Sequence, residues 1–207
     1  MKKLALTACI AGSFLFGATS CTSDNNKDSV DQAQETNEQT FEDTSMQDRK
    51  VDQSDFMTRA ASDGKFEVEA GKLAQQKGQN AEVKKLGGQM VTDHEKANTE
   101  LKALAQKKNI TLPDSMSREH MDKLQSLREK NGAEFDEEYV GAMVDAHDKA
   151  VTLFEDAAEG LEDAEVKAFA SKTLPVLQQH HEHAKRLDET MSNTAGTNTN
   201  RATPSRQ

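Results

Sequence analysis

The chain has 207 residues, of which 30% are charged, and its formal net charge at pH 7 is −10. A chain this acidic is repelled by phosphate backbones, and with no tryptophan and one tyrosine it has few rings that could stack on bases. Composition therefore argues against nucleic acid as a partner.

The first 21 residues, MKKLALTACIAGSFLFGATSC, have the layout of a bacterial lipoprotein signal. Two lysines precede a mostly apolar stretch, Leu4 to Gly17, that is too short for a stable membrane span. Cys21 closes the segment, although Ala18 stands where lipoproteins usually have leucine. We predict a signal peptide over residues 1–20 and a mature chain anchored by lipid on Cys21 in the cell envelope, at the outer membrane or in the periplasm. Ordinary signal cleavage with an incidental cysteine is the alternative.

The sequence contains only one other cysteine, Cys9, which would leave with the signal peptide. No thiol then remains for a disulfide, a metal thiolate or nucleophilic catalysis. Residues 21–51 are polar and acidic, so they carry too little apolar surface to offset the entropy of ordering. We predict a disordered tether over residues 21–51 and a disordered tail over residues 191–207.

Residues 52–190 are predicted to form one all-α domain, because apolar side chains recur every three or four positions. The expected helices span about residues 52–77, 80–108, 115–130, 133–159 and 163–190. The four long ones, each about 40 Å in length, would pack as a four-helix bundle. The link that holds the short helix would be a ferritin-like crossover, which makes the second and third long helices parallel. Pro175 lies inside the last helix, where we expect a bend and an unpaired carbonyl near Ser171.

A near-repeat places a histidine at the same point of the second and third long helices. His94 stands in MVTDHEKA and His147 in MVDAHDKA. On a helical wheel both fall on apolar faces, as do Glu67 and Asp63 of the first helix and His180 of the last. An isolated, unpaired ionisable group on such a face would cost several kcal/mol. These side chains are therefore expected to have partners.

Three interpretations of these inward-facing groups remain open. In the first, they form a buried hydrogen-bond network that fixes helix register. In the second, they bind a divalent transition metal. In the third, the helices are splayed or rotated so that some of these side chains are exposed to water. The candidate metal ligands are Glu67, His94, His147 and His180, because imidazole and carboxylate suit such ions. A di-iron centre of the usual kind is not indicated, because no glutamate stands three positions before any of these histidines.

Three segments resemble, in order, the domain-of-unknown-function family numbered 4142. They are AASDGKFEVEAGKLAQQKGQNAEVKKLGGQMVTDHEKANTELKALAQKKNITLP, FDEEYVGAMVDAHDKAVTLFEDAA and FASKTLPVLQQH. The resemblance, which covers about residues 56–187, implies a ferritin-like bundle, often on exported or lipid-anchored bacterial proteins assigned to the outer membrane. The family pattern falls on Glu67, Asp93, His94, His147, Pro175 and His180. It implies no activity, and it does not include His181 and His183, which are particular to this chain.

Three functional hypotheses follow. The first is a lipid-anchored envelope protein whose domain is a non-enzymatic binding or interaction module, with its protein partner and oligomeric state left open. The second is metal binding or handling through the inward histidines and Glu67. The third, an enzyme, has the least support, because the sequence offers no complete catalytic motif.

Overall fold

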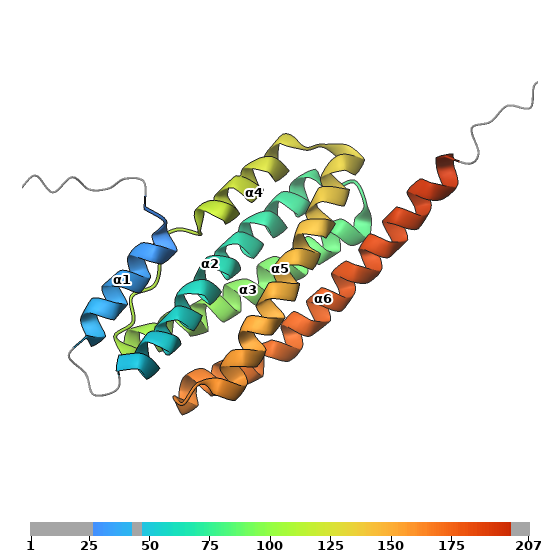
Figure 1. The fold of residues 1–207 in the computed structure, drawn as a ribbon. Helices are drawn as coiled ribbons and strands as arrows, with labels where there is room; N and C mark the ends of the chain where they lie inside the picture. Colours follow the sequence, from blue (N-terminus) through green and yellow to red (C-terminus); the bar gives the residue numbers. More distant parts are fainter. Residues whose placement is uncertain (1–26, 43–46, 200–207) are drawn as a thin grey trace, which may run out of the picture.

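The computed structural model describes residues 27–42 and 47–199 (Figure 1), and within these ranges it contains six α-helices and no strand. They are α1 (Ser29–Phe41), α2 (Gln47–Lys77), α3 (Ala81–Lys108), α4 (Arg118–Glu129), α5 (Gly132–Gly160) and α6 (Ala164–Thr199). The all-α class is confirmed, and α2 to α6 correspond to the five predicted helices. The predicted signal peptide and Cys21 lie outside the described residues.

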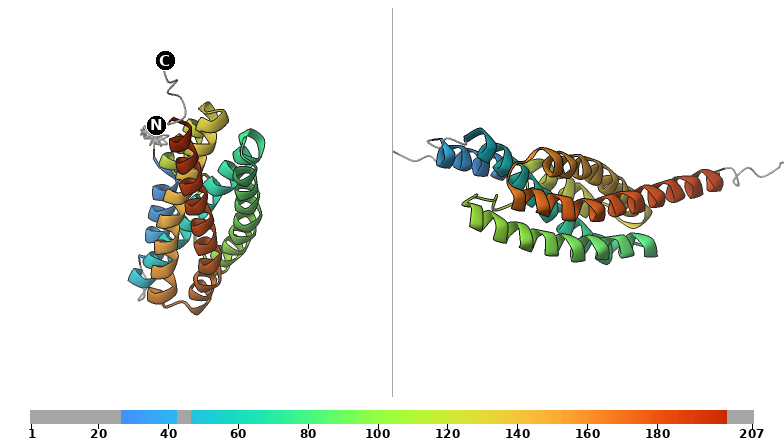
Figure 2. Two further views of the ribbon diagram at one scale, coloured as in Figure 1. Left: turned by 90° about the vertical axis from the view of Figure 1, so that its right-hand side faces the viewer. Right: turned by 90° about the horizontal axis from the view of Figure 1, so that it is seen from below.

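Helices α2, α3, α5 and α6 form a four-helix bundle of two antiparallel hairpins, α2–α3 and α5–α6. Helix α4 runs back along the bundle from the end of α3 towards the start of α5, so α3 and α5 point the same way (Figures 1 and 2). Helix α2 packs on α5 and α3 packs on α6, which leaves α3 and α5 on a diagonal. The predicted ferritin-like crossover with its short helix is confirmed.

Polar caps and one buried carboxylate hold the ends of these helices. Asn80 caps α3 and Ser117 caps α4, each accepting a hydrogen bond from a backbone N–H of the first turn. Asp136 of α5 is 3% exposed, and its carboxylate accepts from the backbone N–H groups of Gln79 and Asn80 (2.8 Å to Asn80). The turn between α2 and α3 is thereby attached to the other hairpin.

The core consists of two apolar clusters, one towards each end of the bundle. The first contains the edge-to-face rings of Phe56 and Phe154, and the second contains the stacked rings of Phe135 and Tyr139. On α5, His147 lies between residues of the two clusters. The same is true of His94 on α3 and His180 on α6, and on α2 the buried Glu67 follows directly after Phe66 of the second cluster. The structure thus places a polar layer where the two clusters meet.

Residues 21–51 were expected to form a disordered tether, but part of this segment is helical. Residues 29–41 form α1, which packs on α2, and α2 itself begins at Gln47. Asn37 and Phe41 of α1 are buried, at 0% and 3% exposure. Residues 29–41 have too little apolar surface to form a core by themselves. Their contacts with the bundle offset the entropy that is lost when they become ordered.

The segment predicted as a disordered tail, residues 191–207, is also partly helical. Helix α6 continues to Thr199, and its C-terminal part projects beyond the bundle (Figures 1 and 2). It passes through Pro175 as one helix, and the bend expected there stays a prediction. Among the described helices, none combines the length and the apolar character required to span a bilayer.

Candidate metal centre

Four ionisable side chains, one from each bundle helix, meet in the polar layer. They are Glu67 of α2, His94 of α3, His147 of α5 and His180 of α6, and none is more than 5% exposed. The structure therefore brings together all four residues that the sequence singled out. Burial of this depth is costly for ionisable groups unless they are paired or bind a metal.

The three imidazole rings form a compact triangle. Their centroids lie 5.6 Å apart for His94 and His147, 5.5 Å for His94 and His180, and 5.4 Å for His147 and His180. One ring nitrogen from each histidine lies within 4.8 Å of those of the other two. Three helices that are far apart in sequence thus present imidazole nitrogens to one point.

One nitrogen of each ring is held by an acceptor. The bonds are His94 Nδ1 to Glu67 Oε2 at 2.8 Å, His147 Nδ1 to the Met143 carbonyl at 3.0 Å, and His180 Nε2 to Asp93 Oδ2 at 2.9 Å. A carboxylate or a backbone carbonyl accepts, so these nitrogens carry the proton. The acceptors fix the orientation of each ring and, in a neutral imidazole, leave the other nitrogen with its lone pair.

Those other nitrogens are buried without a hydrogen-bond partner among the described residues. They are His94 Nε2, His147 Nε2 and His180 Nδ1. Buried polar atoms in folded proteins almost always have a partner, so three such atoms in one cluster require an explanation. A histidine that ligates a metal has this arrangement, with one nitrogen free for the ion and the other N–H held by a carboxylate or carbonyl.

The electrostatics of the layer separate one charged pair from two neutral rings. Burial acts to raise the pKa of Glu67, but its interactions with the neighbouring His94 and His147 outweigh burial and hold that pKa at about 2. Burial acts to lower the pKa of His94, yet the Glu67 carboxylate raises it above the ordinary value. Burial lowers the pKa of His147 to about 4 and also lowers the pKa of His180. His94 therefore holds a proton against Glu67, while His147 and His180 are neutral.

Glu67 supports the cluster from behind His94 and does not belong to the converging set of three nitrogens. Its Oε2 accepts from His94, and its Oε1 lies 3.5 Å from His147 Nδ1 without a hydrogen-bond partner in the described residues. A cavity of about 20 Å³ beside Glu67 and His94 has room for one water molecule. The sequence predicted Glu67 as a ligand, and the structure gives it the geometry of a hydrogen-bond acceptor that orients one.

Sequence reasoning did not identify the roles of three groups near the centre. Asp93 and the Met143 carbonyl orient histidines, and the Tyr139 hydroxyl is buried without a partner among the described residues, with a pKa that burial and the Glu67 charge raise. Tyr139 lies two turns before His147, a spacing that puts both on one helix face and could have indicated it. The family resemblance includes Asp93, but the sequence does not indicate what Asp93 contacts, because its partner is 87 residues away.

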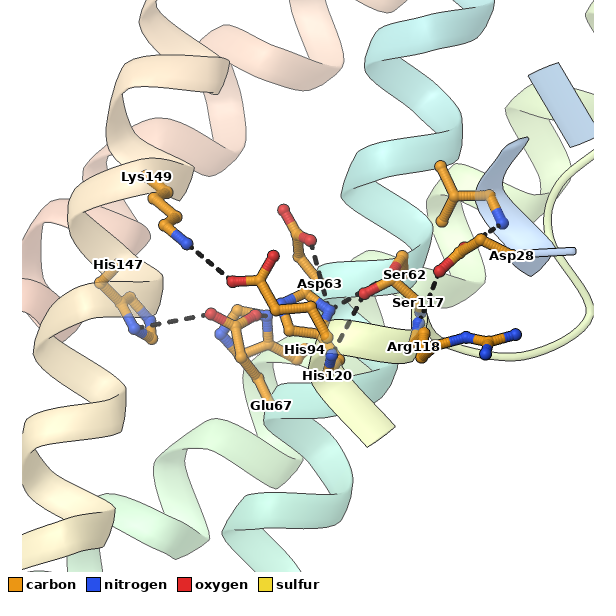
Figure 3. A network of polar contacts seen from close by, with 12 residues as sticks. Asp28, Ser62, Asp63, Glu67, His94, Ser117, Arg118, His120, His147 and Lys149 are labelled. Atoms are coloured by element: carbon orange, nitrogen blue, oxygen red, sulfur yellow. Dashed lines mark hydrogen bonds and ion pairs between the residues drawn. The ribbon is translucent and has the colours of Figure 1, made fainter. Parts of the chain in front are cut away.

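The remaining predicted polar groups lie around the centre. Asp63, one turn before Glu67, comes within 3.7 Å of His120 from α4, as Figure 3 shows. Burial and the charge of Glu67 raise the pKa of Asp63 to about 7. His183 bonds to Gln89 with its Nδ1 at 2.9 Å, outside the cluster.

A comparison with protein-family models matches residues 32–187 to one family, described as Domain of unknown function (DUF4142). The matched range contains every residue of the centre. No match was found among curated proteins or among solved structures.

Proposed function

Because the chain belongs to the DUF4142 family, whose description states no activity, we propose its function from the centre: the domain binds one divalent transition-metal ion through His94, His147 and His180. The observation that carries the proposal is the set of three buried ring nitrogens that lack partners among the described residues, while each opposite nitrogen is held by an acceptor.

The donor set fits such an ion. Neutral imidazole suits zinc, copper, nickel and iron, and two of the three rings are neutral already. A tetrahedral ion with Zn–N bonds of about 2.1 Å places its ligand nitrogens about 3.4 Å apart, so nitrogens within 4.8 Å of one another need only a small approach. A metal with three protein ligands keeps a coordination position for water or a small ligand.

A purely structural hydrogen-bond network explains less of the layer. It accounts for the pair of Glu67 and His94, but it leaves five buried polar atoms without partners among the described residues. Each such atom costs about 1–3 kcal/mol. A bound cation would engage the three ring nitrogens at once, and a coordinated water would offer hydrogen bonds to Glu67 Oε1 or the Tyr139 hydroxyl.

Metal analysis of protein purified without chelator tests the proposal. We expect about one equivalent of metal per chain after exchange against Zn²⁺ or Co²⁺. We also expect His147→Gln and His180→Gln to lose it, because each removes one ligand nitrogen. His181→Gln is the matched control, since His181 lies next to His180 but outside the cluster. No metal in the unsubstituted protein, or full retention in both variants, would contradict the proposal.

We also propose that the domain works at the bacterial cell envelope, anchored by lipid on Cys21. The support is the signal-like segment MKKLALTACIAGSFLFGATSC, and α1 starts at Ser29, only eight positions after Cys21. A short connection of this kind would keep a metal-binding or interaction module near the membrane. Mass spectrometry of the N-terminal peptide should find a lipid on Cys21, and Cys21→Ser should release the protein from membranes. An unmodified Cys21 would contradict the anchor.

A further inference from the structure

A pocket of about 400 Å³ lies between α2, α4 and α5, on one side of the bundle. We name it the acidic vestibule, after the residues that give it its charge: Asp63, Glu119, Asp122, Glu138 and Asp145. Its carboxyl groups outnumber its lysines five to two. Both lysines are already engaged in ion pairs, Lys123 with Glu138 at 2.8 Å and Lys149 with Glu119 at 3.0 Å.

The outer part of the acidic vestibule is open to solvent. The side chains of Glu119 and Lys149 are 75% and 70% exposed. A hollow lined by charges of one sign, with protein walls, concentrates counter-ions from solution. This pocket therefore attracts cations.

Asp63 connects the acidic vestibule to the centre. Its carboxyl group lines the vestibule, and Asp63 also lines the small internal cavity together with Glu67 and His94. The side chain of Asp63 is 29% exposed, against 2% for Glu67, which follows one turn later on α2. Asp63 thus stands at the boundary between solvent and the polar layer.

The inner end of the acidic vestibule contains one carboxyl group and two rings. His120 stacks on Phe66 with the ring centroids 4.7 Å apart and the planes 8° from parallel. Its Nδ1 lies 3.7 Å from Asp63 and 3.3 Å from the Ser62 hydroxyl (Figure 3). One turn further along α2, Glu67 Oε1 is buried without a hydrogen-bond partner among the described residues. A buried carboxylate oxygen in that state attracts a cation.

We propose that divalent cations reach the three-histidine cluster through the acidic vestibule, passing from Asp63 to Glu67. The route rests on the proposed metal function and describes how the same site is loaded. Asp63 and Glu67 hold the ion in turn by their oxygens, and the imidazole nitrogens then take it as the final ligands. Asp63 is therefore a loading residue and not a ligand of the resting centre.

A second approach to the internal cavity runs past Asn98, on the α2–α3 side. Asn98 lines that cavity and also a groove of about 920 Å³ between α2, α3 and α4. Its amide is neutral, and at Gly64 its side chain fills the space that a Cβ would occupy. That groove is also lined by carboxylates, namely Glu69, Glu95, Asp114 and Asp122. The residue that it shares with the cavity is the neutral Asn98, however, whereas the vestibule shares the carboxylate Asp63.

Stopped-flow mixing of the metal-free full chain with Co²⁺ tests the route, because Co²⁺ bound by histidines absorbs visible light. At pH 8, where Asp63 with its pKa of about 7 is mostly ionised, we expect Asp63→Asn to slow the second-order rate constant of binding by about tenfold, the lower end of electrostatic steering effects. The endpoint should remain one Co²⁺ per chain. Asp63→Glu should restore most of the rate. Asp188→Asn, an exposed site on α6, should stay within about twofold because distant exposed charges are screened by salt.

The outcomes separate this inference from the proposed function. An unchanged rate in Asp63→Asn, with one Co²⁺ bound, would overturn the route alone, and slowing by Asn98→Leu instead would assign loading to the other side. A folded Asp63→Asn protein that binds no Co²⁺ would make Asp63 part of the centre and would also overturn the route. Absence of Co²⁺ binding by the unsubstituted protein would overturn the proposed function and the route together.

Discussion

The adjacent residues Asp93 and His94 contribute to the centre in two different ways. Neighbours on a helix point about 100° apart, so His94 faces the bundle interior while Asp93 reaches across to His180 of α6. Because Asp93 binds Nε2 of His180, that ring presents Nδ1 to the cluster, whereas His94 and His147 present Nε2. One short segment of α3 thereby supplies one histidine of the centre and the acceptor that orients another.

The proton on His94 gives a prediction about pH. The Glu67 carboxylate raises the pKa of His94 above its ordinary value of 6.5, so at pH 6 the ring carries this proton. A metal needs the deprotonated nitrogen, and His147, with a pKa of about 4, is already neutral at that pH. Calorimetry at pH 6 in buffers of different ionisation enthalpy should therefore find about one proton released per metal. Affinity should fall about tenfold per pH unit below the His94 pKa.

Glu67→Gln is the matched variant for this prediction. The amide oxygen still accepts a hydrogen bond from His94 Nδ1, but the negative charge that raises the His94 pKa is gone. Burial then lowers that pKa, and we expect proton release at pH 6 to drop towards zero. Release of about one proton from this variant would show that Glu67 does not set the charge of His94.

The sequence could predict the centre's inward side chains but not their partners. Glu67, His94, His147 and His180 stand on apolar faces, and that pattern is visible in one helix at a time. Which nitrogen each histidine offers depends on contacts such as the one between Asp93 and His180, which only the packed bundle creates. Whether Glu67 is a metal ligand or a hydrogen-bond acceptor for His94 also depends on how the helices pack, so the sequence alone could not decide it.

Helices α2 and α3 approach each other unusually closely one turn from the centre. A Cβ on Gly71 would lie 2.7 Å from the Gly87 carbonyl oxygen, and one on Gly87 would lie 2.7 Å from that of Gly71. These glycines therefore let the backbones touch beside Glu67 and His94. The 2.8 Å bond between the two side chains depends on that spacing.

Gly71→Ala should force the two helices apart. We expect a loss of about 1–3 kcal/mol in the free energy of unfolding, the usual cost of overpacking, together with weaker metal binding. The matched control is Gly141→Ala in α5, where a Cβ would meet nothing within 4 Å. That substitution should stabilise the protein by up to about 1 kcal/mol, because alanine favours helix over glycine. Urea unfolding measures both, and equal effects at the two sites would contradict the role of the close approach.

The elements differ in how far the sequence could predict them. The long bundle helices were predictable because each repeats its apolar pattern over many turns, and the ferritin-like order followed from the length of the crossover. Helix α1 has no such repeat. It is ordered by contacts with residues far along the chain, such as Thr111, and no local pattern contains that information.

At the scale of the molecule, α1 changes how the bundle relates to its N-terminal connection. It packs on α2, and Asp28 at its start accepts hydrogen bonds from the backbone N–H groups of Val30 and Arg118, which joins the beginning of α1 to the beginning of α4 (Figure 3). The same α4 carries His120 and part of the acidic vestibule. If the chain is anchored upstream of α1, these contacts would therefore keep the vestibule side of the bundle close to the anchor.

The attachment of α1 depends strongly on Asn37. Its amide donates to the Thr111 carbonyl at 3.0 Å and accepts from the Thr111 N–H at 2.8 Å, and the side chain is fully buried. Asn37→Ala should leave both backbone groups of Thr111 without that partner, at a cost of about 2 kcal/mol. Because α1 lies outside the four-helix bundle, we expect it to open locally while the bundle and its metal binding persist.

Hydrogen exchange measured by mass spectrometry distinguishes local opening from global unfolding. In Asn37→Ala, protection should fall over residues 29–41 and around Thr111, and it should be retained in α5 and α6. Glu38→Ala changes an exposed neighbour on the same helix and should alter stability by no more than about 0.5 kcal/mol. Loss of protection throughout the bundle would instead mean that α1 is an integral part of the cooperative fold, and that the metal centre could not form without it.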